Sequence, residues 1–98
     1  MKVGFLDPAE QELTEAIDYY NTQSDGLGYL LAAEVQKSIS RIIHYPEAWT
    51  LLSKRTRRCL VNRFPYAVIY QQQNELIIII AIQNLHQHPD SWDSRVEK

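Results

Sequence analysis

A run of positive charge in the second half of the chain is the strongest chemical signal in the sequence. Five cations and no acid lie within ten residues, at Lys54, Arg55, Arg57, Arg58 and Arg63. Four of the five are arginine, whose guanidinium group binds a phosphate or a carboxylate through two parallel hydrogen bonds. We therefore predict that this basic run forms an anion-binding surface for nucleic acid or for an acidic protein segment. The alternative is an ordinary solvated surface whose charges keep a sheet edge from aggregating.

Two histidines near the C-terminus could add acid–base chemistry to such a surface. A histidine with a pKa near neutrality, at His86 or His88, could move a proton at a ribose 2′-hydroxyl or at the leaving oxygen. Arg58 or Arg63 could stabilise the negative charge that develops on the phosphate. Together these residues would make a ribonuclease site. Their spacing is not diagnostic, so surface histidines in a C-terminal loop are the competing interpretation.

The composition excludes several classes of protein. The 98 residues predict one domain spanning residues 1–98, because two halves would each be too small to bury a stable core. The single cysteine, Cys59, excludes an internal disulfide and favours the reducing cytoplasm. The longest apolar run, residues 76–82, is far shorter than the roughly 20 residues that span a bilayer. No Cys–His or multi-carboxylate cluster suggests a metal, and no motif suggests a cofactor.

The charge is distributed unevenly along a chain whose formal net charge is −2. Residues 1–53 hold eight acids against three bases, and residues 54–70 hold five bases and no acid. Residues 71–98 hold four acids against two bases. The sequence therefore predicts a polarised molecule, with an acidic first half and a basic stretch where the second half begins.

Two amphipathic helices are expected after a short first strand, "KVGF". In "DPAE" we expect Asp7 to cap the first helix, with Pro8 at its first position and Glu10 three residues after the cap. A second helix should begin near Leu27 and end before Pro46, and the polar segment "NTQSDGLG" joins the two as a hairpin. The apolar stripes predict buried side chains at Leu13, Ile17, Leu31, Val35, Ile39 and Ile42.

The rest of the chain supplies a sheet. "RRCLV" and "YAVIYQ" have the composition of strands, and "ELIIIIAIQNL" is apolar enough to be buried on both faces. "QQN" is expected to form the turn between the last two strands. The order predicts an α+β fold with two helices on one face of a mainly antiparallel sheet. If residues 57–63 form a strand, alternation divides the cations between its faces, so most of them belong to its ends and its approach loop.

The order of these segments matches a known family. The set "AIDYY", "LGYLLAAEVQKSISRIIHYPEAW", "RRCLVNRFPYAVIYQ" and "HPDSWDSR" resembles the RelE/ParE superfamily of toxins from type II toxin–antitoxin systems, over nearly the whole chain. The resemblance implies the same strand, helix, helix, three-strand fold. It also implies a growth-inhibiting, plasmid-stabilising toxin that a cognate antitoxin holds inactive in a hetero-oligomer. Binding residues would then include the basic run and, in the C-terminal segment, Trp92 and Arg95.

Members of this superfamily act in two ways, and the sequence leaves both open. Some cut mRNA on the ribosome as endoribonucleases, and others bind a host enzyme such as DNA gyrase without chemistry of their own. Relatives often carry a His and one or two Arg after the last strand, where this chain has Asn84, His86 and Gln87. A net charge of −2 is also unfavourable among the phosphates of ribosomal RNA. We therefore favour a ParE-like binding toxin over a RelE-like ribonuclease, with an inactive antitoxin-binding module as the third alternative.

Other conspicuous side chains favour structural roles. Trp92 should anchor the C-terminal segment to the body of the protein. Cys59 should be a small buried apolar side chain in a strand. Tyr66 and Tyr70 should lie at the edge of the core with their hydroxyl groups in water.

Overall fold

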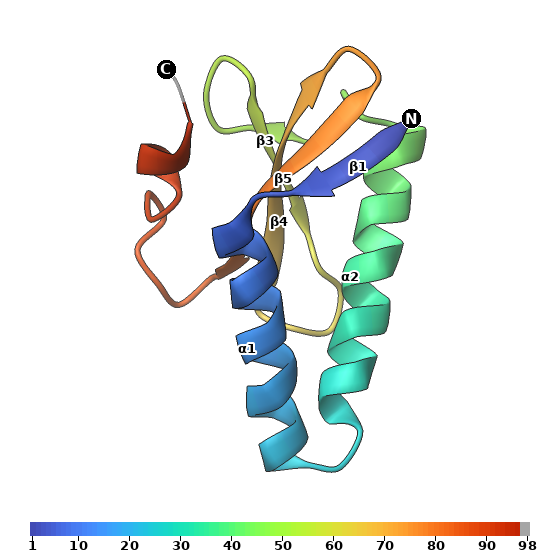
Figure 1. The fold of residues 1–98 in the computed structure, drawn as a ribbon, viewed down its shortest axis with the longest axis vertical. Helices are drawn as coiled ribbons and strands as arrows, with labels where there is room; N and C mark the ends of the chain where they lie inside the picture. The colour runs from blue at the N-terminus through green and yellow to red at the C-terminus, as the bar shows by residue number, and fades with distance from the viewer. Residues whose placement is uncertain (97–98) are drawn as a thin grey trace.

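A helical hairpin and a sheet built from both ends of the chain form an α+β fold (Figure 1). The computed structural model describes residues 1–96. In chain order the elements are β1 (Lys2–Phe5), α1 (Asp7–Gln23), α2 (Leu27–His44), β2 (Thr50–Leu51), β3 (Thr56–Leu60), β4 (Tyr66–Gln73), β5 (Leu76–Asn84) and the short 3₁₀ helix η1 (Asp93–Arg95). One sheet holds all the strands in the order β1-β5-β4-β3-β2, with β1 parallel to β5 and the other neighbours antiparallel. The predicted fold class is confirmed, with one strand more than the sequence indicated, β2.

The two helices lie side by side on one face of the sheet, where they enclose the larger part of the core (Figure 1). Four side chains of the predicted stripes are buried, all of them on α2: Leu31, Val35, Ile39 and Ile42. They pack with Val68 and Tyr70 of β4 and with Ile77, Ile79 and Ile82 of β5. Leu13 and Ile17 on α1 are only half-buried, and Leu13 borders an open groove between the helices and β1.

The start of α1 differs from the sequence prediction. Asp7 is the first helical residue and Leu6 is the N-cap, so the predicted Asp7 cap is wrong. The reason is that the chain enters the helix directly from the sheet, since the Leu6 N–H still donates to the Ile79 carbonyl at 3.0 Å. Asp7 and Glu10 remain in the first turn, where their charge is favourable to the helix dipole.

The second face of the sheet is covered by the C-terminal segment. Trp92 is 4% exposed and packs in a smaller apolar cluster with Ala67, Ile69, Ile80 and Ala81. The predicted anchoring role of Trp92 is confirmed, and β5 is buried on both faces as expected. Because both faces of the sheet are apolar, the C-terminal segment removes the side chains of the second face from water, as the helices do on the first face.

The ends of two strands differ from those predicted from the sequence. β3 ends at Leu60, one residue before the end of the predicted "RRCLV" and short of the longer alternative to residue 63, because the chain turns back there and the Val61 N–H donates to the Tyr66 carbonyl at 2.9 Å. β4 continues through Gln73, so the hairpin turn falls on residues 74–75 and not on "QQN". Asn74 occupies the left-handed region with φ of 56°, which asparagine adopts more readily than most residues.

Candidate functional site

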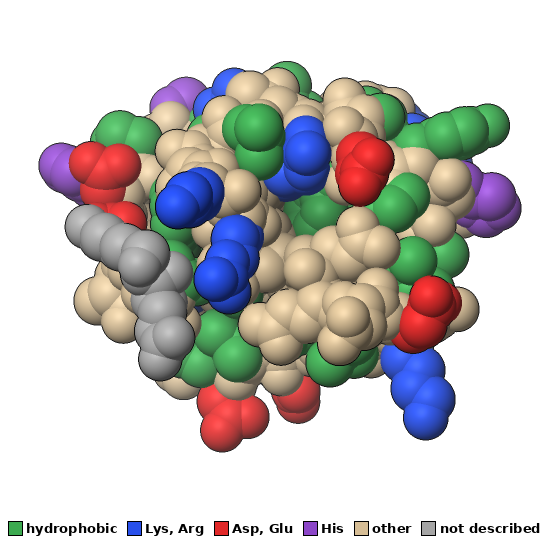
Figure 2. All heavy atoms as spheres, turned by 90° about the horizontal axis from the view of Figure 1, so that it is seen from above, with side chains coloured by type: hydrophobic (Ala, Val, Ile, Leu, Met, Phe, Trp, Pro, Cys, Tyr) green, Lys and Arg blue, Asp and Glu red, His purple; other side chains and the backbone are tan. Residues whose placement is uncertain are grey.

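The basic run does not form one continuous surface. Lys54 and Arg55 are exposed in the loop between β2 and β3. Figure 2 looks onto this end of the molecule and shows Lys and Arg side chains gathered near the centre of the face. Arg57 and Arg58 follow in β3, are half-buried, and point to opposite faces because they are neighbours in a strand. Of the five cations, Lys54, Arg55 and Arg63 are therefore the exposed ones, and Lys54 and Arg55 are neighbours in the loop.

The two strand arginines have different surroundings. Arg57 donates from Nη1 to the Trp49 carbonyl at 2.8 Å, so it ties β3 to the segment before β2. Arg58 lies opposite Ile69 in the register of β3 and β4, on the face that the C-terminal segment covers. Its Nε is buried and has no hydrogen-bond partner within residues 1–96. Arg57 is thus a structural residue, whereas Arg58 retains an unused donor.

Arg63 sits apart from the other four cations, in the turn after β3. Its backbone is left-handed with φ of 73°, and its Nη1 lies 3.8 Å from Oε2 of Glu34 on α2. Lys37 approaches the same oxygen at 3.6 Å. Glu34 is only 6% exposed, so these two cations offset the burial of its charge. This contact places the Arg63 guanidinium beside α2, while most of the side chain remains exposed to solvent.

The two histidines are exposed in the segment that leaves β5. The main-chain N–H of His86 donates to Oδ1 of Asn84 at 2.9 Å, and the N–H of Asp90 donates to Nδ1 of His88 at 3.2 Å. Across residues 1–96, no hydrogen bond or ion pair joins either histidine to Arg58 or Arg63. The structure therefore does not bring the candidate ribonuclease residues together through direct contacts.

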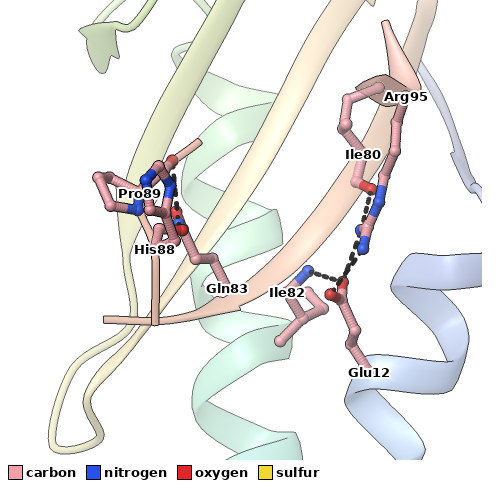
Figure 3. Close-up of polar contacts among 7 residues, drawn as sticks. All are labelled: Glu12, Ile80, Ile82, Gln83, His88, Pro89 and Arg95. Atoms are coloured by element: carbon pink, nitrogen blue, oxygen red, sulfur yellow. Dashed lines mark hydrogen bonds and ion pairs between the residues drawn. The ribbon is translucent and has the colours of Figure 1, made fainter. Parts of the chain in front are cut away.

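The C-terminal segment is held to the sheet by side chains on both sides of β5 (Figure 3). On one side, Gln83 donates from Nε2 to the carbonyls of His88 and Pro89, both at 3.1 Å. On the other, Arg95 forms a two-pronged ion pair with Glu12 of α1, with N–O distances of 2.8 and 2.9 Å. These hydrogen bonds, which Arg95 donates to Glu12, raise the pKa of the Arg95 guanidinium. Arg95 is therefore engaged within the protein, and its charge is neutralised.

Sequence reasoning missed Glu12. It is one of several acids on α1, and nothing in the local pattern distinguishes it from Glu10 or Glu15. Its role depends on β5, because its Oε1 also accepts the main-chain N–H of Ile82 at 3.1 Å. Only the packing of α1 against β5 reveals this contact.

Two further side chains have interior positions. Cys59 is 1% exposed, as expected, and burial raises the pKa of its thiol, which therefore stays protonated and unreactive at neutral pH. Tyr70 is also 1% exposed, and its hydroxyl donates to the Pro46 carbonyl at 2.5 Å, so the predicted wet hydroxyl is wrong for this residue. Burial raises the pKa of Tyr70 to about 12.

An apolar groove of about 340 Å³ runs between β1 and the helices. Its lining is mostly aliphatic and aromatic, with Val3, Phe5, Leu13, Ala32, Val35, Gln36, Ile39 and Ile43. Within residues 1–96 there is no group of three or more His, Cys, Asp or Glu side chains that could hold a metal ion. No helix in that range is long and apolar enough to cross a membrane.

Comparison with known proteins agrees with the fold. Residues 3–91 match the family described as "ParE toxin of type II toxin-antitoxin system, parDE". Two sequences named Toxin ParE2, from the CDC 1551 / Oshkosh and H37Rv strains of Mycobacterium tuberculosis, are each 28% identical over 88 residues, covering 89% of this chain and 84% of theirs. A solved structure titled "Chromosomal ParDE TA system from P. aeruginosa" superimposes with a TM-score of 0.75 at 13% identity, covering 87% of this chain and 96% of that one.

The hairpin of helices over a five-stranded sheet, with a C-terminal segment across the second face, is the fold of a RelE/ParE superfamily toxin. Because the match covers residues 3–91, the chain belongs to the ParE toxin family of type II toxin–antitoxin systems.

Proposed function

We propose that this chain is the growth-inhibiting member of a ParDE-type pair, and that a cognate antitoxin neutralises it in a cytoplasmic hetero-oligomer. We further propose that it inhibits growth by binding a host target such as DNA gyrase, without cutting RNA. The observation that carries the first part is the family match over residues 3–91. The second part rests on how the candidate nuclease residues are arranged.

The positions of the basic and histidine side chains support binding over RNA cleavage. A nuclease of this kind needs a general acid or base and a charge-stabilising cation directed at the same phosphate. Arg63 is instead paired with Glu34 on the helix side of the sheet. His88 lies in the segment across the other face, where Gln83 holds its carbonyl. Arg95, the nearest cation in sequence to the histidines, is neutralised by Glu12.

Two surfaces suit an antitoxin segment that folds on binding. The apolar groove beside β1 fits the apolar face of an amphipathic segment. The exposed pair Lys54 and Arg55 fits acidic side chains of the same segment. A partner that combines an apolar stripe with acidic residues would use both surfaces.

The test of the mode of action is to express the chain without its antitoxin in a bacterial host and to map mRNA ends and DNA breaks. We expect gyrase-dependent double-strand breaks and intact transcripts. The double variant His86→Ala/His88→Ala should arrest growth as the parent does. Loss of a proton-transfer group would lower a nuclease rate by about 10²–10⁴, which a growth assay would reveal.

Two results would overturn this mode of action. Codon-phased transcript cleavage that disappears in the double histidine variant would make the protein a RelE-like, ribosome-dependent endoribonuclease. Antitoxin binding without growth arrest, breaks or cleavage would make it an inactive antitoxin-binding module.

A further inference from the structure

The two helices of the hairpin carry opposite charges. α1 contains five acids and no base. On α2 the single acid, Glu34, is buried, whereas Lys37 is exposed and Arg41 is half-buried one helical turn further on. The charge that α2 presents to solvent is therefore positive, although the chain as a whole has a formal net charge of −2.

The buried carboxylate of Glu34 brings together two cations from different elements. Nζ of Lys37 and Nη1 of Arg63 lie 3.6 and 3.8 Å from the same oxygen, Oε2 of Glu34. Arg63 comes from the turn after β3, which passes beside α2 (Figure 1). The contact leaves both cations accessible, since the side chains of Lys37 and Arg63 remain 65% and 68% exposed.

Arg41 extends this group along the helix. Its Nη2 donates to Oγ of the buried Ser38 at 2.9 Å and to the Leu60 carbonyl at 3.4 Å, so the side chain is fixed against β3. Within residues 1–96 Arg41 forms no ion pair, and its charge is not compensated. The α2 cluster, which we define as Lys37, Arg41 and Arg63, thus sets three cations against one carboxylate.

The size of the α2 cluster favours an acidic protein segment over a nucleic acid. A protein that binds a phosphate backbone commonly makes about six to ten contacts, and here three cations lie beside a helix with five acids. A protein segment can instead carry its carboxylates only where the cations are. Acids four positions apart in a helix have the same spacing as Lys37 and Arg41.

We propose that the α2 cluster is a docking surface for an acidic segment of a partner protein, whose carboxylates recur about one helical turn apart. One carboxylate meets Lys37 and Arg63, and the next meets Arg41. Because Glu34, Ser38 and Leu60 already hold these cations, less side-chain freedom is lost on binding. The proposal does not depend on the mode of toxicity, since neither gyrase nor RNA enters it.

The test is an NMR titration of the full chain at low ionic strength with two blocked peptides, acetyl-EASAEASAEASA-amide and acetyl-QASAQASAQASA-amide. The glutamate peptide should shift the main-chain amides of Lys37, Arg41 and Arg63, and the glutamine peptide should leave them unchanged. Lys37→Gln and Arg63→Asn should each bind the glutamate peptide about two- to fivefold more weakly, as expected for one exposed ion pair. Asparagine suits the left-handed backbone at position 63.

The control is Lys2→Gln, which removes the charge of an exposed lysine on β1 and should bind as the parent does. The proposal is overturned if the glutamate peptide shifts none of the three amides, or if Lys2→Gln weakens binding as much as Lys37→Gln, which would show attraction by net charge alone. It is also overturned if an oligothymidine binds the same residues more tightly than the glutamate peptide, which would make the occupant a nucleic acid. The dispersion of each amide spectrum shows that the variant is folded.

Discussion

At the scale of single residues, the pair Glu12 and Arg95 has more contacts than its place near the surface suggests. Both side chains are three-quarters or more buried, and each also binds a main-chain group of β5. Two charge-assisted hydrogen bonds and two main-chain contacts therefore depend on one ion pair. Such a pair is worth more than an exposed one, because its geometry is two-pronged and solvent screens it less.

We expect Glu12→Gln to lower the free energy of unfolding by about 1.5–3 kcal/mol, the usual value of hydrogen bonds to a charged group. Glutamine can still accept the Ile82 N–H, but it leaves the Arg95 charge without a counter-ion. Urea unfolding measures the change. Glu10→Gln is the matched control and should change stability by less than about 0.5 kcal/mol, because Glu10 is exposed. Equal stability of Glu12→Gln and the parent would show that the ion pair contributes nothing.

Tyr70 should make the protein sensitive to alkali. Its pKa is about 12 in the folded protein, where burial disfavours the phenolate, and about 10 in the unfolded chain. The contribution of Tyr70 to the free energy of unfolding is fully present below pH 10. It is lost as the pH rises toward 12, because the tyrosine of the unfolded chain releases its proton at a lower pH than that of the folded protein. Between pH 10 and pH 12, Tyr70 lowers the free energy of unfolding by about 1.4 kcal/mol for each pH unit.

The measurement is urea unfolding at pH 9 and pH 11. Between these values, Tyr70→Phe should lose about 1 kcal/mol less stability than the parent, although its stability at pH 9 is lower because the bond to Pro46 is gone. Tyr29→Phe is the control, since Tyr29 is 70% exposed, and it should follow the parent. A parallel fall in the parent and Tyr70→Phe would contradict the assignment.

At the scale of elements, the hairpin of α1 and α2 depends on a close approach near its turn. A Cβ on Gly28 would lie 2.0 Å from the Ile17 carbonyl oxygen and 2.8 Å from the Asn21 side chain. Oδ1 of Asn21 also accepts the Gly28 N–H at 2.8 Å, which satisfies one of the free donors at the start of α2. The first helix thus caps the second, and only glycine leaves room for it.

Gly28→Ala should lower the free energy of unfolding by about 2–3 kcal/mol, because a backbone oxygen cannot move aside without separating the helices. The better helix propensity of alanine offsets part of the strain. Thermal and urea unfolding both report the change. In Gly4→Ala the added Cβ has no atom within 4 Å, so this variant should stay within about 0.5 kcal/mol of the parent. A stable Gly28→Ala would mean that the helices separate at little cost.

At the scale of the whole molecule, the sequence predicts a polarised charge distribution. In the structure, few cations of the basic run are exposed without a bonded partner. Lys54 and Arg55 are exposed in the β2–β3 loop, whereas Arg57, Arg63 and Arg95 are engaged by other groups. Charge reversal at Arg57 or Arg58 would disturb the fold, because both are half-buried. The loop pair is therefore the appropriate place to test electrostatic docking.

Lys54→Glu and Arg55→Glu should each weaken binding of the cognate antitoxin, and the loss should shrink at high salt because screening has already removed part of the attraction. Titration calorimetry at low and high ionic strength measures the antitoxin affinity of each variant. The control is Lys2→Glu, an exposed lysine of β1 that changes the net charge equally. If all three variants bind alike at low salt, the loop is not a docking surface.

The sequence by itself determined the kinds of element and much of the core. Helical spacing placed Leu31, Val35, Ile39 and Ile42 on a buried face, and the run at residues 76–82 indicated a strand buried on both sides. These are local properties, since a period of 3.6 or 2 residues is visible in a short window. The ordered segments also indicated the toxin superfamily to which the chain belongs.

Only the tertiary structure decided which polar groups meet. Of the five neighbouring cations, two are exposed in a loop, two are half-buried in β3, and Arg63 is exposed in a turn beside Glu34, because β3 ends at Leu60 and the chain turns away. Glu12 and Arg95 are 83 residues apart in the chain and become partners because α1 and the C-terminal segment meet at β5. No local pattern encodes such a contact, since it depends on how the sheet brings distant segments together.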